Sequence, residues 1–138
     1  LNRDAGMLAT RHNVRAATDI TGYSLLGHAW EMASVSGVGL KFNFEEIPFY
    51  SGAKQLAAGW CFAGGSFDNA DFFEPHVRFT PSLTEDQQLL LFDPQTSGGL
   101  LFAVSPDMAA LCEKDAHDNN IPVWRIGEVT ETGLIDVN

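Results

Sequence analysis

The amino-acid sequence predicts a single layered α/β or α+β domain with a mixed β-sheet, and two observations support this. Segments with helical periodicity and segments with strand-like periodicity alternate along the chain, which is typical of layered α/β architectures. The chain has 138 residues, of which 45% are hydrophobic and 19% are charged, so it can bury one substantial core. It contains no internal repeat, low-complexity segment or linker, so residues 1–138 are treated as one domain.

Five segments have the apolar spacing of amphipathic helices. They cover residues 4–13, 22–36, 50–59, 84–91 and 106–118. The second has the clearest apolar stripe, and Gly37 is placed to close it. Ser82 and Glu85 have the spacing of a capping box at the start of the fourth. Ser105 and Pro106 provide a cap and a first-turn proline for the fifth.

Six segments have the character of strands. They cover residues 15–18, 38–44, 76–80, 100–104, 121–129 and 134–137. The segment 38–44 alternates apolar and polar residues, as a half-buried strand does, whereas 100–104 is apolar throughout and is predicted to be buried. The stretch 60–81 is the least regular, with Gly64, Gly65 and five phenylalanines. It is predicted to be mainly a long loop, either a packed Ω-type loop or a functional flap.

Composition and charge exclude several classes of function. The net charge of −10 comes from 18 acidic and 8 basic residues, so no nucleic-acid partner is expected. No apolar run approaches the length of a membrane span, so no membrane partner is expected either. Cys61 and Cys112 are far apart without metal-ligand or redox spacing, and both are predicted to be small buried hydrophobes. A reducing, cytoplasmic location fits this use of cysteine.

The first polar cluster lies within residues 17–28, which read Ala-Thr-Asp-Ile-Thr-Gly-Tyr-Ser-Leu-Leu-Gly-His. An extended segment delivers the Asp19 carboxylate to its C-terminal end, and Thr21 and Gly22 follow where a helix begins. The N–H groups of a helix N-terminus suit phosphate, and a carboxylate beside them suits Mg²⁺. The alternative is that Asp19 or Thr21 only caps the helix.

The second polar cluster lies between two apolar runs and comprises Asp93, Pro94, Gln95, Thr96, Ser97, Gly98 and Gly99. The side chains at 95–97 can donate or accept hydrogen bonds, and the two glycines allow close approach of the backbone to a ligand. A plain turn that starts at Asp93-Pro94 is the alternative. The cluster is not a P-loop, because no Gly-Lys-Ser/Thr follows.

Two further polar residues lie near the first cluster. His28 is placed about two turns into the predicted helix and could face a ligand, but a solvent-facing or locally hydrogen-bonded histidine is the favoured interpretation. Ser24 has no Gly-x-Ser-x-Gly context, so a hydrolase nucleophile elbow is not supported.

The two clusters resemble motifs of the selenide, water dikinase (selenophosphate synthetase) family. Residues 17–28, with Glu31-Met32, are similar to its Thr-Asp-x-Thr-Gly-Phe-Gly-Leu-Leu-Gly-His segment, and 92–101 resemble its Asp-Pro-Gln-Thr-Ser-Gly-Gly-Leu-Leu segment. Gly64-Gly65-Ser66 and Asn69 resemble its Gly-Gly-Thr-x-x-Asn loop, and 126–129 correspond to a similar strand. The chain departs from the pattern at Tyr23-Ser24, usually Phe-Gly, and at Phe67-Asp68, where a basic residue is common.

This resemblance implies an α/β/α layered C-terminal domain of the aminoimidazole-ribonucleotide-synthetase-like superfamily. Such a domain closes a cleft against an N-terminal domain that holds most ATP and metal ligands. The family reaction converts selenide, ATP and water to selenophosphate, AMP and phosphate with Mg²⁺. By position, Asp19 is the expected metal ligand, and the expected nucleotide-binding residues are Thr21, Gly22, Gln95, Thr96, Ser97, Gly98 and Gly99.

The same resemblance implies which parts of the enzyme lie outside this sequence. The family's catalytic Cys or selenocysteine and its Lys lie in the N-terminal segment, so no catalytic residue is expected among these 138. The chain alone is therefore expected to be inactive, with its own N-terminal domain as partner and a homodimer as the full-length form. The alternatives are another ATP-dependent synthetase of the superfamily, and a non-catalytic ligand-binding domain of the same fold.

Overall fold

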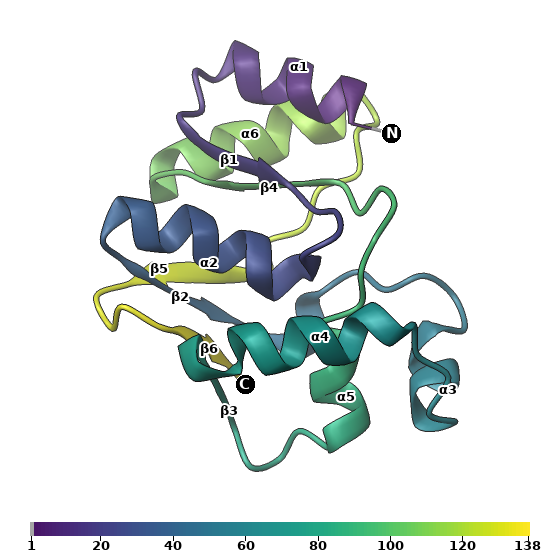
Figure 1. Cartoon of the computed structure of the whole chain (residues 1–138). Helices are drawn as coiled ribbons and strands as arrows, with labels where there is room; N and C mark the ends of the chain where they lie inside the picture. The colour runs from purple at the N-terminus through teal and green to yellow at the C-terminus, as the bar shows by residue number, and fades with distance from the viewer. Residues whose placement is uncertain (1) are drawn as a thin grey trace.

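The computed structural model describes residues 2–138, in which helices and strands alternate as predicted (Figure 1). The helices are α1 (Arg3–Arg11), α2 (Ser24–Ser36), α3 (Ala53–Ala58), α4 (Gly64–Phe73), α5 (Glu85–Leu90) and α6 (Pro106–Asp118). The strands are β1 (Ala16–Asp19), β2 (Gly39–Phe42), β3 (Val77–Phe79), β4 (Leu100–Ala103), β5 (Gly127–Thr130) and β6 (Ile135–Val137). Two 3₁₀ turns, η1 (Phe44–Glu46) and η2 (Glu74–His76), complete the set. None of these helices combines the length and apolarity that crossing a bilayer requires.

The strands form two sheets. A four-stranded sheet has the order β3-β6-β2-β5, in which β6 is parallel to both β3 and β2 and β5 is antiparallel to β2. A separate antiparallel pair joins β1 to β4. Helix α2 contacts both sheets, α1 and α6 lie together beyond the β1–β4 pair, and α4 and α5 lie at the other end of the molecule (Figure 1). The predicted layered α/β class with a mixed sheet is therefore confirmed, although the split into two sheets was not predicted.

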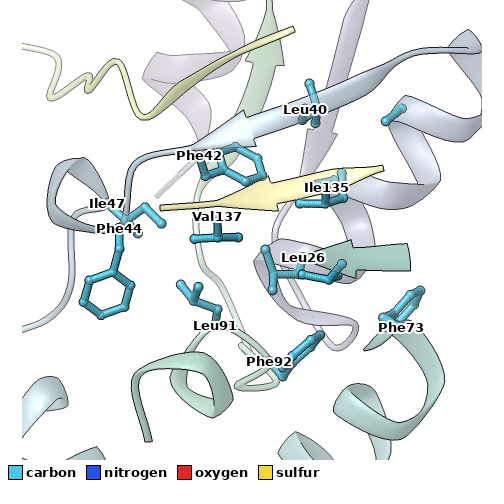
Figure 2. Packing of buried hydrophobic residues seen from close by; sticks show 13 residues of the cluster. Leu26, Leu40, Phe42, Phe44, Ile47, Phe73, Leu91, Phe92, Ile135 and Val137 are labelled. Atoms are coloured by element: carbon cyan, nitrogen blue, oxygen red, sulfur yellow. The ribbon is translucent and has the colours of Figure 1, made fainter. Parts of the chain in front are cut away.

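The main core lies where α2 covers β2 and β6. The apolar stripe of α2 consists of Leu26, Ala29, Trp30 and Ala33. All of these are buried except Trp30, which is half-buried. They pack against alternate residues of β2 and β6, as the period of two in a strand requires. Figure 2 shows Leu40 and Phe42 beside Ile135 and Val137 in this cluster. The helix thus stands directly on the sheet, and its N-terminus is fixed at the end of β1.

The prediction of a long loop over 60–81 is wrong, because residues 64–73 form α4. The two glycines that suggested a loop are instead the first two residues of α4. Phe73 is buried, while Phe67 and Phe72 are exposed, so not all of these phenylalanines belong to the core. At Gly27 a Cβ would lie 2.5 Å from the Phe73 ring, so this glycine allows α4 to pack close to α2.

Three smaller predictions also differ from the structure. Cys61 is exposed, so only Cys112 is the buried residue that was expected. The last long strand covers only β5, because residues 121–126 contain Pro122, which lacks the N–H that a ladder needs. The capping box of α5 uses Thr84 and Gln87, two residues later than predicted. The predicted cap of α6 by Ser105 is confirmed, because its side chain accepts a hydrogen bond from the Met108 N–H.

One carboxylate joins the two outer helices. Asp115 on α6 accepts hydrogen bonds from Arg11 Nε at 2.9 Å and Nη2 at 3.1 Å, and its Oδ2 lies 2.8 Å from His12 Nε2 at the end of α1. The hydrogen bonds from Arg11 and then His12 hold the pKa of Asp115 below its ordinary value. The ionised carboxylate therefore stabilises the docking of α1 onto α6.

We predict that Asp115→Asn lowers the urea midpoint at neutral pH, and that its difference from the unmodified chain shrinks in acid. A depressed folded-state pKa adds stability above the unfolded-state value of about 3.9, and this stability is lost as the pH falls through the folded value. Urea titrations from neutral pH to about pH 2 measure this, with Asp71→Asn as the control, because Asp71 is an exposed residue of α4. A difference that is independent of pH contradicts the assignment.

Ser24, the first residue of α2, has a left-handed backbone with φ of 68° and is fully buried. Its Oγ accepts a hydrogen bond from the Gly27 N–H at 3.4 Å. A left-handed conformation costs an L-residue about 1–2 kcal/mol, and the related motif carries glycine at this position. The Gly27 N–H donates mainly to the Tyr23 carbonyl at 3.1 Å, and the serine hydroxyl offsets part of that cost as its second acceptor.

We predict that Ser24→Gly is more stable than Ser24→Ala by about 1–2 kcal/mol, because alanine keeps the strain and loses the hydrogen bond. Ser34, exposed within the same helix, is the matched control. There the order reverses, and glycine is less stable than alanine by about 0.5–1 kcal/mol. Urea unfolding of the four variants measures both differences, and the same order at both positions would refute the strain at Ser24.

Candidate functional site

The connection from β1 to α2 presents a free carboxylate. Asp19 is the last residue of β1, pairs with Leu100 of β4, and is exposed. Within residues 2–138 no hydrogen bond or ion pair engages its carboxylate. The helix cap is Tyr23, without a side-chain hydrogen bond, so the alternative that Asp19 or Thr21 caps α2 is wrong.

The 93–99 loop is pinned to this connection by three backbone hydrogen bonds. The Gln95 N–H donates to the Thr21 carbonyl at 3.1 Å, and the Gly98 N–H donates to the Ile20 carbonyl at 2.8 Å. The Ile20 N–H donates in return to the Gly99 carbonyl at 3.0 Å. The two polar clusters, far apart in sequence, therefore form one continuous surface at the end of the β1–β4 pair.

The structure requires glycine at positions 98 and 99 of this loop for two different reasons. A Cβ at Gly98 would lie 2.9 Å from the Ile20 carbonyl oxygen, so glycine here allows the loop to approach its own neighbouring segment. Gly99 has φ of 99°, a conformation that L side chains rarely adopt. Thr96 and Ser97 are exposed, and Gln95 is half-buried. Thr96 and Ser97 are thus the loop side chains most open to a ligand.

A buried amide on α4 ties the two clusters together. Asn69, with 7% of its surface exposed, donates from Nδ2 to the Gly22 carbonyl at 2.9 Å and to the Phe92 carbonyl at 3.1 Å. These carbonyls stand just before α2 and just before the 93–99 loop. One side chain therefore fixes the separation of both segments.

Asp93 is the one carboxyl side chain within the 93–99 loop. Burial raises its pKa above the ordinary value, and a hydrogen bond from Ser66 Oγ at 3.5 Å opposes that shift in part. Gln95 Nε2 also donates to the Asp93 carboxylate. Asp93 is therefore held inside the loop by its neighbours and has a structural role, in contrast to the free Asp19.

His28 lies at the centre of a hydrogen-bonded chain beside the first cluster. Its Nε2 is 3.0 Å from Thr21 Oγ1 and accepts from the Tyr23 N–H at 3.4 Å. Its Nδ1 is 3.0 Å from Glu31 Oε2. Only 13% of its side chain is exposed. The interpretation of His28 as a locally hydrogen-bonded residue is confirmed, and it does not face open solvent.

Among residues 2–138 no cluster of three or more histidine, cysteine or acidic side chains could enclose a metal ion. Asp19 offers one carboxylate at an exposed strand end. That donor fits one ligand of a hard cation such as Mg²⁺, which usually takes one or two protein carboxylates and completes its shell with phosphate oxygens and water. The described residues therefore supply one ligand of such a site and not a complete set of ligands.

Sequence reasoning found part of this site and missed another part. The structure brings Asp19, Thr21 and Gly22 together with the loop residues Gln95, Gly98 and Gly99. The bridge through Asn69 was missed, although the Gly-Gly-Ser and Asn pattern at 64–69 was a usable signal. The pairing of His28 with Glu31 has the i,i+3 spacing of helix neighbours, which was a second signal.

The family model described as "AIR synthase related protein, C-terminal domain" matches residues 2–138. The chain belongs to this family. The superfamily and the fold class that the two motifs implied are thereby confirmed. The resemblance to the selenide, water dikinase family is confirmed by relatives of that name.

Relatives of the domain include proteins named selenide, water dikinase. That of Caldanaerobacter subterraneus subsp. tengcongensis is 44% identical over 110 residues, which cover 79% of this chain and 31% of the relative. That of Trichlorobacter lovleyi is 38% identical over 129 residues, 94% of this chain and 37% of the relative. The chain therefore spans about a third of the length of these relatives.

A solved structure shares the fold. Thiamine-monophosphate kinase from Stenotrophomonas maltophilia K279a superposes with a TM-score of 0.67 at 17% identity, over 100% of this chain and 35% of that one. At this identity the likeness concerns the fold alone.

We predict that Asn69→Ala destabilises the domain by about 1–3 kcal/mol, because it leaves a buried carbonyl without its donor. The amides of Gln95 and Gly98 should also exchange faster with solvent, because their hydrogen bonds depend on the clamped loop. Chemical unfolding and amide hydrogen exchange measure the two effects. Asp68→Ala, exposed on the same helix, is the control and should change stability by less than about 0.5 kcal/mol. Unchanged exchange at both amides in Asn69→Ala would contradict the clamp.

Proposed function

We propose that this domain is the C-terminal part of a selenide, water dikinase (selenophosphate synthetase), an ATP-dependent phosphotransferase. The enzyme makes selenophosphate, AMP and phosphate from selenide, ATP and water. The observation that carries the proposal is the joining of residues 17–28 and 92–101 into one surface by backbone hydrogen bonds and by Asn69. Identity of 35–44% to proteins of that name supports it.

In this proposal Asp19 is a carboxylate ligand of Mg²⁺ beside the nucleotide. Its exposure and its lack of a partner within residues 2–138 leave it free for a cation. The bound cation would offset charge on the phosphoryl groups during transfer. Thr21 and Gly22, with Gln95, Thr96, Ser97, Gly98 and Gly99, would line the same cleft. This arrangement suits a chain with a net charge of −10, because such a surface needs cations to hold a polyphosphate.

The remaining parts of the proposal concern the rest of the protein. The N-terminal domain would supply the nucleophile, the lysine and the other metal ligands, and this domain would close the cleft over them. The full-length protein would be a homodimer. The proposed location is the cytoplasm, where an exposed thiol such as Cys61 stays reduced.

We predict that Asp19→Asn in the full-length protein lowers AMP formation from selenide and ATP by about 100-fold, since the metal is held mainly by carboxylates. Binding of Mn²⁺, followed by electron paramagnetic resonance, should weaken in parallel. Asp68→Asn on α4 is the matched control, because it removes an exposed carboxylate outside the site. The 138-residue chain alone should form no AMP. Full activity of Asp19→Asn would instead favour a non-catalytic domain of this fold.

A further inference from the structure

The chain Glu31–His28–Thr21 joins an acidic side chain, an imidazole and a hydroxyl in series. Glu31 Oε2 lies 3.0 Å from His28 Nδ1, and Thr21 Oγ1 lies 3.0 Å from His28 Nε2. The imidazole is nearly enclosed, with 13% of its side chain exposed, whereas Glu31 is 52% exposed. The hydroxyl at the end of the chain lies two residues after Asp19.

Two contacts fix the tautomer of His28. The Tyr23 backbone N–H is directed at Nε2 at 3.4 Å, which favours Nε2 as an acceptor without a proton. The Glu31 carboxylate can only accept, so Nδ1 carries the proton that bonds to it. With both ring nitrogens assigned, the hydrogen bond between Thr21 and His28 has a direction. The Thr21 hydroxyl donates its single proton to Nε2.

This direction decides what the Thr21 oxygen can bind. Its proton is committed to His28, so Oγ1 offers only lone pairs to anything else. A phosphate oxygen, which is also an acceptor, gains nothing from such a partner. A water molecule can donate to it, and water bound to a cation is an especially good donor.

Thr21 lies two residues beyond the free carboxylate of Asp19, where β1 ends. Strand-like pairing continues past that end, because Ile20 exchanges backbone hydrogen bonds with the 93–99 loop and the Thr21 carbonyl accepts one from it. Along such a paired segment, residues two apart lie on the same face. Ile20, which lies between them, points into the protein and is buried. Asp19 is exposed and Thr21 is partly exposed, as expected for the opposite face. The side chains of Thr21 and Asp19 therefore leave this segment on the same side.

We propose that Thr21 orients a water molecule in the shell of the cation at Asp19, and that His28 and Glu31 are positioning residues that hold the Thr21 hydroxyl as an acceptor. The location of the water rests on the proposed function, because that function provides the cation. The direction of the hydrogen bonds does not. Thr21 is thereby reassigned from a nucleotide ligand to a water-orienting residue.

The tautomer is tested by nitrogen-15 NMR of the histidine side chains in mildly alkaline solution, where an imidazole is neutral. We expect His28 to carry its proton on Nδ1. Glu31→Leu should shift the proton toward Nε2, and Glu31→Gln should restore the Nδ1 form, because the amide oxygen still accepts. Glu85→Leu, an exposed acid on α5, is the control. A proton on Nε2 in the unmodified chain overturns the proposal.

The role of the hydroxyl is tested by steady-state kinetics of the full-length enzyme with ATP and selenide. Thr21→Val keeps the shape and loses the oxygen, and it should lower kcat by about 10- to 100-fold, the usual loss for a group that orients a metal ligand. The KM for ATP should stay within about twofold, because uniform substrate binding is untouched. Thr21→Ser should recover most of the lost kcat.

A rise in the KM for ATP with unchanged kcat in Thr21→Val would show that Thr21 binds nucleotide, and it overturns the proposal. The Asp19→Asn variant tests the proposed metal site independently of the His28 tautomer. If Mn²⁺ binding and activity are unchanged in this variant, Asp19 is not a metal ligand. The water-orienting role of Thr21 is then overturned as well, because it requires a cation at Asp19. The Nδ1 tautomer of His28 should persist in that variant, because none of its partners is altered.

Discussion

The arrangement of the site depends on the amide of Asn69. Backbone carbonyls must be paired when they are buried, and this amide pairs one carbonyl ahead of α2 and one ahead of the 93–99 loop. Because a single rigid side chain serves both, the distance between the two segments is set by α4. Helix α4 is in turn set by its close contact with α2, which Gly27 permits by leaving room for Phe73. The site is therefore as rigid as the packing of two helices.

The sequence predicted the fold well where burial and periodicity coincide. Helix α2 and strand β2 each have one apolar face against the core, so their patterns are clear. Helix α4 was missed because its exposed side also carries phenylalanines, at 67 and 72, which removes the amphipathic contrast that signals a helix. The β1–β4 pair was missed as a separate sheet because strand pairing between distant segments leaves no local signal.

The site was predictable in its members but not in its connections. Motif residues such as Asp19 and Gly98 were identified, yet Gly98 was expected to admit a ligand, and it admits the Ile20 carbonyl instead. A glycine is needed wherever other atoms come close to the backbone, whether those atoms belong to a ligand or to the chain itself. The sequence alone therefore cannot distinguish the two cases. The pairing of His28 with Glu31 follows from their i,i+3 spacing, but the contact between His28 and Thr21 depends on a side-chain rotamer and on the turn at Tyr23. Residue spacing alone does not encode these two features.

The departure from the family pattern at Tyr23-Ser24 can be assessed from this geometry. Ser24 has a left-handed backbone, with φ of 68°, which is the conformation that glycine adopts at the lowest cost. The Tyr23 ring lies 5.5 Å from the His28 ring and 5.8 Å from the Phe73 ring, and its backbone N–H still reaches His28. The Tyr23 side chain therefore packs against the imidazole, and the Ser24 hydroxyl bonds within the first turn of α2. In this chain neither side chain interrupts the hydrogen bonds that His28 makes with Thr21 and Glu31.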